Sequence, residues 1–212
     1  MIFQQIQADG DRNFGYVITD EQTKESAVID PSYAPEIFID ILERRNFKII
    51  YAIGTHSHGD HIGGIGEIKK IGAKVVLHKS APSQSDIQVN DGDVLKLGQL
   101  ELKIIHTPGH TQDSICILAE NKLMTGDTLF VGKVGGTNND ESVRIEFDSL
   151  FNKLMKLDDS IEVYPGHDYG VAPTSTIGHE RKTNPFLLRT NLKDFKWLKD
   201  NWASYKLEHG IK

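Results

Sequence analysis

The densest group of chemically active side chains follows an apolar run at residues 49–53. Four groups that can bind a metal ion, His56, His58, Asp60 and His61, fall within six positions there. Imidazole and carboxylate donors favour zinc, iron or manganese over calcium. The absence of cysteine from this segment argues against a closed structural zinc site, which usually carries thiolates. The segment is therefore typical of an open, catalytic metal site.

The spacing of these donors indicates two binding directions. Side chains two residues apart on an extended chain point the same way, so His56 and His58 can bind one cation. Asp60 and His61 lie where the chain turns into a helix through residues 63–64, so they face another direction and one loop can serve two metals. The alternative is a polar loop whose histidines cap a helix or bind water. Four such groups in a row favour the metal interpretation.

Three more candidate donors follow apolar strands later in the chain. They are His110 after residues 100–105, Asp127 after residues 122–124, and His167 after residues 161–164. Loops at strand ends, held by a rigid sheet, are where binding and catalytic sites are normally built. We therefore expect these three loops and the histidine segment to converge in space.

The elements that must position these loops can be read from hydrophobic periodicity and turn residues. We expect an antiparallel meander at 2–6, 14–19 and 26–30, strands at 48–53 and 74–77, and hairpins at 94–105 and 114–124. Helices are expected at 34–47, 62–71, 148–157 with Asp148 as N-cap, and 192–207. Residues 132–141 form a loop that could overhang the site, and residues 168–190 are expected to be largely irregular.

Length and composition limit the class of protein. The 212 residues suit a single domain, 1–212, with a core in 1–190 and a C-terminal helix in 191–212. A net charge of -6 gives no indication of binding to nucleic acid or to an anionic membrane, because both favour a basic protein surface. Cys116 is the single cysteine and lies in an apolar run, which favours a buried, inert thiol. We expect a cytoplasmic protein, because no apolar run approaches the length of a membrane span and no leader pattern opens the chain. The sequence specifies no oligomeric state.

The ordered motifs resemble those of the metallo-β-lactamase superfamily over residues 9–190. They are Thr55-His56-Ser57-His58-Gly59-Asp60-His61, Gly109-His110-Thr111, Gly126-Asp127 and Gly166-His167. The resemblance implies an α/β (α+β) fold, a four-layer αββα sandwich with two mixed sheets face to face, helices outside and metals at one edge. It also implies which donors act together: His56, His58 and His110 on one metal, Asp60, His61 and His167 on the other, and Asp127 between them.

Within the superfamily, the chain is similar to glyoxalase II (hydroxyacylglutathione hydrolase). The likeness lies in residues 12–16, 125–131 and 183–187. Two features depart from that family. Ser57 replaces a histidine that is not a ligand, and the helical insert that follows the last histidine, and that carries part of the glutathione site, is missing.

The compact tail at residues 167–185 also resembles persulfide dioxygenases. That resemblance implies one iron, held by the equivalents of His56, His110 and Asp127. The characteristic loop of those enzymes is not evident in residues 132–137, so the hydrolase remains the favoured prediction.

The chemistry that follows is hydrolysis by a metal-bound hydroxide. Two metals about 3.5 to 4 Å apart can share a water and lower its pKa toward neutrality. Asp60 could orient that hydroxide as well as bind metal, and Asp127 would bridge the two ions. Thioesters suit the scheme because a thiolate leaves without a strong general acid. We therefore expect a small thiol conjugate such as S-2-hydroxyacylglutathione as substrate, and two divalent ions as cofactors, with zinc favoured over iron or manganese.

Two other functions remain open at this point. One is a mononuclear iron dioxygenase that acts on glutathione persulfide, and the other is a metal-binding protein without catalysis. In either the hydrolase or the dioxygenase, five side chains could contact an anionic substrate tail: Lys133, Tyr169, Arg181, Lys182 and Arg189. Solvated surface charge explains the last three equally well, and packing explains Tyr169 equally well.

Overall fold

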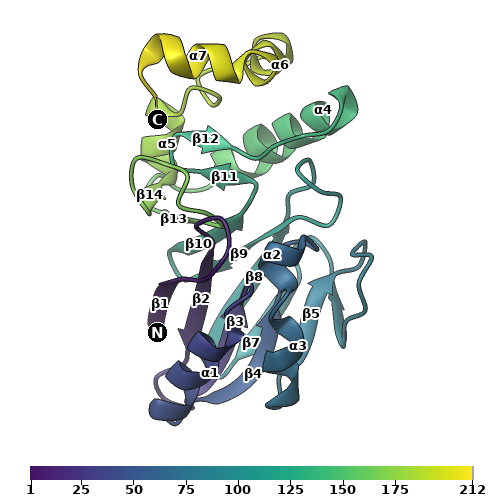
Figure 1. The fold of residues 1–212 in the computed structure, drawn as a ribbon, viewed down its shortest axis with the longest axis vertical. Helices are drawn as coiled ribbons and strands as arrows, with labels where there is room; N and C mark the ends of the chain where they lie inside the picture. Colours follow the sequence, from purple (N-terminus) through teal and green to yellow (C-terminus); the bar gives the residue numbers. More distant parts are fainter. Residues whose placement is uncertain (212) are drawn as a thin grey trace.

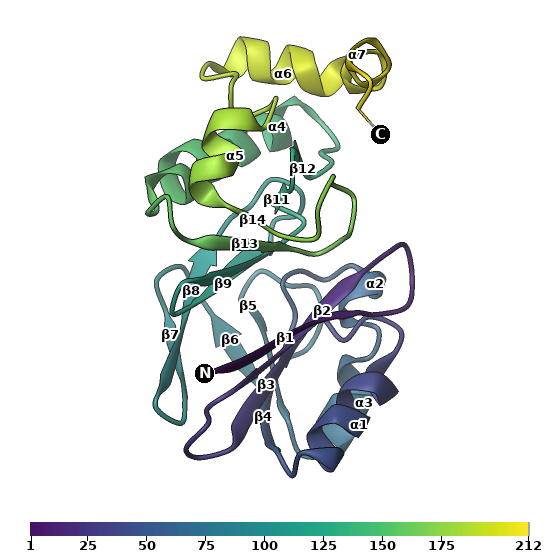
Figure 2. The ribbon, with the colours of Figure 1, turned by 90° about the vertical axis from the view of Figure 1, so that its left-hand side faces the viewer.

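Two six-stranded sheets lie face to face in the computed structural model, which describes residues 1–211, and helices cover both outer faces (Figures 1 and 2). The αββα sandwich and the two mixed sheets expected from the sequence are confirmed. The central core lies between the sheets and combines side chains from both, such as Ile18 and Ile53 from one and Ile104 and Ile117 from the other.

The first sheet is built from the N-terminal part of the chain. Its strands, in spatial order, are β1 (Ile2–Gln7), β2 (Phe14–Thr19), β3 (Glu25–Ile29), β4 (Lys48–Ile53), β5 (Lys74–His78) and β6 (Ile87–Val89). The first three strands form the predicted antiparallel meander, and β3 to β6 pair in parallel. Because successive side chains alternate between faces, Val17 and Ala52 face the outer helices while Ile18 and Ile53 face the other sheet.

The second sheet runs in the order β14-β13-β10-β9-β8-β7. Its strands are β7 (Val94–Leu97), β8 (Leu100–His106), β9 (Ile115–Ala119), β10 (Lys122–Gly126), β13 (Glu162–Pro165) and β14 (Ser175–Thr176). A short hairpin, β11 (Leu129–Phe130) and β12 (Lys133–Val134), follows β10. Since β10 and β13 are parallel neighbours, both strands deliver their following loops to the same edge.

The helices form two groups, one on each sheet. The first group is α1 (Pro35–Arg44), α2 (Gly59–Ile62) and α3 (Ile65–Lys70). The second group is α4 (Asp140–Asp148), which continues through a π-helical turn (Ser149–Lys153) and a 3-10 turn (Leu154–Lys156), then α5 (Ile177–Thr183), α6 (Leu192–Asp200) and α7 (Trp202–His209). Phe195 and Leu198 of α6 are fully buried against α4 and the second sheet, so the C-terminal segment is docked rather than free.

Three helix predictions and one loop prediction need correction. The helix expected at 62–71 is α3 at residues 65–70, preceded by the short α2 at residues 59–62, and Gly63 and Gly64 between them pack closely against Tyr33 and Pro35. The helix expected to start at Asp148 starts at Asp140. Its N-cap is Asn139, whose side chain accepts a hydrogen bond from the Ser142 amide at 2.9 Å.

The other two corrections concern the C-terminal part. Residues 168–190 contain β14 and α5, and Thr176 caps α5 by accepting a hydrogen bond from the His179 amide. The single helix expected at 192–207 is interrupted at Asn201, which leaves α-helical geometry with φ of -113°. The assignment of residues 1–212 to one domain stays a prediction. Across residues 1–211, no helix has the length and apolar character that crossing a membrane requires.

Candidate metal centre

Four loops meet at one edge of the sandwich, each at the carboxyl end of a strand. The loops follow β4, β8, β10 and β13. Backbone hydrogen bonds join them: Gly166 N–H donates to Gly126 O, Ile115 N–H to Thr55 O, and Phe14 N–H to Gly166 O, each at 2.8 Å. The convergence expected from the sequence is therefore present, and it is fixed by the backbone.

The first group of donors comes from both sheets. His58 Nδ1 lies 2.9 Å from His56 Nε2 and 3.1 Å from His110 Nε2. One donor atom from each of the three residues lies within 4.8 Å of the others, which is a spacing that one metal ion can bridge.

The second group consists of Asp60, His61 and His167. His61 Nε2 lies 3.2 Å from His167 Nε2, and Asp60 Oδ2 lies 3.4 Å from His167 Nε2. These donors also lie within 4.8 Å of one another. His61 and His167 are buried, whereas the Asp60 side chain is about one-third exposed.

Asp127 lies between the two groups of donors, and its carboxylate oxygens face both of them. Its Oδ1 is 3.3 Å from His61 Nε2 and 3.5 Å from His167 Nε2, while its Oδ2 is 3.6 Å from His110 Nε2. Oδ1 is buried and has no hydrogen-bond partner among the described residues. A buried carboxylate oxygen without a partner is costly. Divalent cations would satisfy this oxygen and the facing imidazole nitrogens together, so the residues fit the metal site that their types predict.

The outward nitrogens of four histidines are held by partners that leave Nε2 facing inward. His110 Nδ1–H donates to Gly136 O and His167 Nδ1–H to Asp11 O, both at 2.8 Å. His61 Nδ1 lies 2.8 Å from Asp30 Oδ2. His56 Nδ1 lies 3.2 Å from Thr55 Oγ1. Such partners fix the tautomer and ring orientation of a metal-binding imidazole.

Burial and the neighbouring charges shift the protonation of these groups strongly. Burial holds the pKa of His56 well below its usual range. Burial also opposes the charged form of His61, but the carboxylates of Asp30 and Asp127 outweigh it and raise the pKa of His61 to about 10. A cation that binds His61 must therefore displace a proton, so metal affinity is expected to fall at low pH.

Three supporting residues were missed by the sequence reasoning. Asp30 holds His61 and Thr55, Asn13 Nδ2 donates to Asp60 O at 2.9 Å and to Asp60 Oδ2 at 3.2 Å, and the Asp11 carbonyl accepts from His167. Asp30 stands at a strand end before proline, as the other site residues stand at strand ends, and that position was the available signal. Nothing in the sequence marks a backbone carbonyl such as that of Asp11.

Two of the five predicted substrate residues lie beside the metal donors. The Tyr169 ring stacks on the His167 ring, with centroids 4.5 Å apart and planes 4° apart, and its hydroxyl donates to Asp11 Oδ2 at 2.6 Å. Lys133 Nζ lies 4.7 Å from the centre of the Tyr169 ring. The Arg12 guanidinium lies 4.8 Å from the centre of the same ring and 3.6 Å from Asp11 Oδ1, so two cationic groups and one carboxylate surround Tyr169.

The other three predicted substrate residues make contacts elsewhere. Arg181 donates to the carbonyls of Met155 and Leu157 at 3.1 and 3.0 Å and pairs with Asp159. Lys182 is exposed on α5. The Arg189 guanidinium lies 5.8 Å from the centre of the Tyr205 ring of α7. The structure therefore does not bring Arg181, Lys182 or Arg189 to the metal donors.

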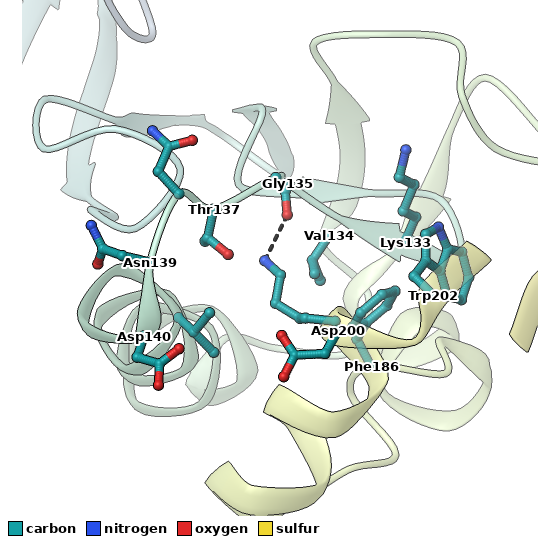
Figure 3. Close-up of a pocket in the computed structure, with 13 residues that line it drawn as sticks. Lys133, Val134, Gly135, Thr137, Asn139, Asp140, Phe186, Asp200 and Trp202 are labelled. Atoms are coloured by element: carbon teal, nitrogen blue, oxygen red, sulfur yellow. Dashed lines mark hydrogen bonds between the residues drawn. The ribbon is translucent and has the colours of Figure 1, made fainter. Parts of the chain in front are cut away.

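A cavity of about 460 Å³ lies beside this centre, over the segment from Lys133 to Asp140 and against α6 and α7 (Figure 3). Its wall includes Gly136, whose carbonyl holds His110, and also Phe186 and Trp202. The cavity and the metal donors thus share one loop.

Comparison with known proteins agrees with this geometry. The family model described as the metallo-beta-lactamase superfamily matches residues 9–83 and 78–167. The human mitochondrial persulfide dioxygenase ETHE1 is 30% identical over 181 residues, covering 82% of this chain and 71% of that protein. A hydroxyacylglutathione hydrolase of Rhodopseudomonas palustris is 39% identical over 165 residues, covering 74% of this chain. This chain spans only 63% of that hydrolase.

Among solved structures, ETHE1 from Myxococcus xanthus matches with a TM-score of 0.90 and 32% identity, covering 95% of this chain and 91% of that one. A metallo-beta-lactamase from Staphylococcus aureus matches with a TM-score of 0.82 and 29% identity, covering 92% of this chain and 65% of that one. The motifs, the arrangement of the donors and the family match lead to one assignment: the chain belongs to the metallo-β-lactamase superfamily.

Proposed function

We propose that this protein is a metal-dependent hydrolase that cleaves a thioester of a small thiol conjugate, of the hydroxyacylglutathione type, with two divalent ions. The observation that carries the proposal is the position of Asp127. Its two oxygens face two separate groups of donors, as a bridging ligand requires. His56, His58 and His110 would hold one ion, and Asp60, His61 and His167 the other.

When bound, the pair of ions supplies an activated water at neutral pH and stabilises the negative charge that develops on the carbonyl oxygen. The chain itself supplies orientation. Asn13 holds the backbone carbonyl and the carboxylate of Asp60, so this partly exposed carboxylate is placed where it can orient the attacking water. Burial of His56, His61 and His167 keeps other water away from the floor of the site.

Two cationic side chains beside the centre support an anionic thiol conjugate as substrate. Lys133 and Arg12 both lie over the Tyr169 ring, next to His167. Burial lowers the pKa of Lys133, and the charge of Lys206 adds to the effect, which is the environment of an ammonium group that would gain from an anionic partner. The resemblance to hydroxyacylglutathione hydrolases is consistent with such a substrate.

A mononuclear iron persulfide dioxygenase is the second candidate. It is favoured by the match to ETHE1 from Myxococcus xanthus, which covers 95% of this chain and 91% of that one. In that case His56, His110 and Asp127 would hold the iron.

Metal analysis together with two assays separates the candidates. Two ions per chain and cleavage of S-2-hydroxyacylglutathione support the hydrolase. One iron per chain and oxygen uptake with glutathione persulfide support the dioxygenase and overturn our proposal. Thioester cleavage that persists after complete removal of metal by a chelator would contradict both the role of the ions and the assignment of the seven donors.

A further inference from the structure

A buried ion pair that the proposed chemistry does not use lies behind the His110 loop. Lys199 of α6 pairs with Glu146 of α4, and the two side chains are 9% and 1% exposed. Burial raises the pKa of Glu146 to about 7 and lowers the pKa of Lys199, so the pair is held at a cost in solvation. A buried ion pair is often no more stabilising than an apolar pair of the same size. Stability alone therefore does not explain why this pair is present.

The Lys199 ammonium makes a second contact, which leads toward the candidate metal centre. Its Nζ donates to the carbonyl of Gly135 at 2.7 Å, the hydrogen bond drawn as a dashed line at Gly135 in Figure 3. The next carbonyl along the chain, Gly136 O, accepts the hydrogen bond of His110 Nδ1 at 2.8 Å. Only one peptide unit thus separates the atom that Lys199 holds from the atom that holds His110.

Glu146 and the Gly135 segment also pack directly on the loops that carry site residues. A side chain at Gly109, which precedes His110, would overlap the backbone and Cβ of Glu146. A side chain at Gly135 would overlap the carbonyl oxygen of Asp127. The ion pair therefore lies where α4, α6 and the loops bearing two candidate ligands come together.

The acceptor for His110 lies in a loop, whereas the partner of His61 is a buried side chain at a strand end. His61 is held by Asp30 at the end of β3. His167 is held by the carbonyl of Asp11, and the neighbouring carbonyl of Arg12 accepts a hydrogen bond from the Asp168 amide. The partner of His110 lies instead in the Gly-rich connection between β12 and α4, where backbone freedom is greatest. A tether on that connection is needed to keep the acceptor in place.

We propose that Lys199 is a positioning residue for His110: by holding Gly135 O, and being held by Glu146, it fixes Gly136 O so that His110 carries its proton on Nδ1 and presents Nε2 to the metal. The proposal rests on the role of His110 as a metal ligand in the proposed function. It makes the C-terminal helix α6 a part of the ligand support.

The test uses the full chain and two measurements that need no substrate. The first is the tautomer of His110 in metal-free protein, from nitrogen-15 NMR of the imidazole ring. The second is zinc affinity by competition with a chromophoric chelator. In Lys199→Met we expect the Nδ1–H form of His110 to lose its dominance and zinc affinity to fall about 10-fold, as for loss of other supports of metal-binding histidines. Lys199→Arg keeps a hydrogen-bond donor at this position, and we expect it to retain most of the Nδ1–H form of His110 and most of the zinc affinity.

Two further variants make the result decisive. The matched control is Lys196→Met on the same helix, whose ammonium pairs with the exposed Asp140 and Asp200 at 2.9 and 2.8 Å, and which should leave both measurements unchanged. If the unpaired Glu146 prevents folding, the double variant Glu146→Gln/Lys199→Met, which is neutral at both positions, carries the same expectation.

Three results would overturn the proposal. One is a folded Lys199→Met or double variant in which His110 keeps the Nδ1–H form and zinc affinity stays within twofold. Another is a variant at Lys199 that loses zinc affinity while the tautomer of His110 stays unchanged. The third is a loss of zinc affinity in Lys196→Met equal to that in Lys199→Met. Failure of the metal site itself is distinguishable, because His110→Ala would then bind zinc as tightly as the wild type.

Discussion

Asp30 fixes the metal-binding segment through both of its carboxylate oxygens. Oδ1 accepts the Thr55 amide at 2.8 Å, and Oδ2 accepts the Thr55 hydroxyl at 2.6 Å and lies 2.8 Å from His61 Nδ1. The residue has φ of 47°, a conformation that Asp and Asn adopt more readily than most residues. Its side chain is 1% exposed, so its contacts are shielded from water.

Replacement of this carboxylate should weaken metal binding. In Asp30→Asn, the amide cannot hold the imidazole of His61 as a carboxylate does, and we expect zinc affinity to fall about 10- to 100-fold. Competition with a chelator measures the loss. Asp20→Asn is the matched control, because Asp20 is also buried and accepts the Gln99 amide at 2.9 Å, but in a turn away from the centre. Equal losses of zinc affinity in the two variants would contradict the assigned role.

The ammonium of Lys133 gives a second prediction at the level of one residue. In Lys133→Met we expect the KM for an anionic thioester to rise about fivefold, with kcat nearly unchanged, since a partly exposed charge contact contributes about 1 kcal/mol. A neutral thioester should show no change in KM. Lys182→Met serves as control, because that side chain is exposed on α5. A KM that rises equally for both substrates would argue against charge recognition.

Strand β9 places Cys116 in the interior of the second sheet, as the apolar run around it predicted. The thiol is fully buried, and burial raises its pKa to about 11. We therefore expect no alkylation by iodoacetamide at pH 8 within the time that labels the same protein in urea, with mass spectrometry as the measurement. Rapid labelling of the native protein would mean that β9 separates from its neighbours β8 and β10.

Strands β5 and β8 end in two histidines that stack across the interface of the sheets. The rings of His78 and His106 lie 3.8 Å apart with planes 13° apart. Burial lowers the pKa of His78 to about 4, with the charges of His106 and Lys79 adding to the effect.

This stack should make the fold sensitive to acid. Because the pKa of His78 is lower in the folded state than the value of about 6.5 in the unfolded chain, its contribution to stability is full above that value. The contribution is lost as the pH falls from about 6.5 toward 4, because the unfolded chain binds the proton first. We expect the free energy of unfolding of the wild type to drop by roughly 2 to 3 kcal/mol more than that of His78→Gln over this range, measured by urea denaturation. Parallel pH profiles for the two proteins would contradict the prediction.

For the molecule as a whole, the metal donors come from both sheets, so bound ions would join the two layers. His56, His58, Asp60 and His61 follow the first sheet, and His110, Asp127 and His167 follow the second. Zinc at 100 times its dissociation constant should add about 2.7 kcal/mol to the free energy of unfolding. For a chain of this size, Tm should rise by roughly 5 to 10 °C. Calorimetry with and without zinc checks this, and a Tm that zinc leaves unchanged would contradict a site that spans the sheets.

Much of this architecture could be predicted from local sequence patterns. Alternation and turn residues predicted the ten longer strands and missed the short β6, β11, β12 and β14, and the strand-end positions of His110, Asp127 and His167 predicted where the donors would meet. The start of α4 was missed because the Gly- and Asn-rich residues before it are typical of a loop, yet Asn139 is its N-cap. A local pattern of polar residues does not show which of them will cap a helix once the fold is packed.

The supports of the site were harder to predict, since they depend on contacts between distant segments. Lys199 is one of several lysines on an amphipathic helix, and only the docking of α6 on α4 distinguishes it from Lys196. The roles expected for Arg181 and Arg189 came from charge alone, which does not say where a side chain will lie once its segment is packed. Asn13 and Asp60 are 47 residues apart in sequence.

The contact between the first hairpin and the last ligand loop determines when the centre can form during synthesis. Asn13 pairs with His167 as an antiparallel bridge, and Asp168 N–H donates to Arg12 O. A nascent chain on the ribosome therefore exposes His56 to His61 long before the residues that close the site exist. If the seven donors bind ions as proposed, the complete set exists only after residues 166–168 have been synthesised, and the first hairpin must wait for the same residues to find its partners.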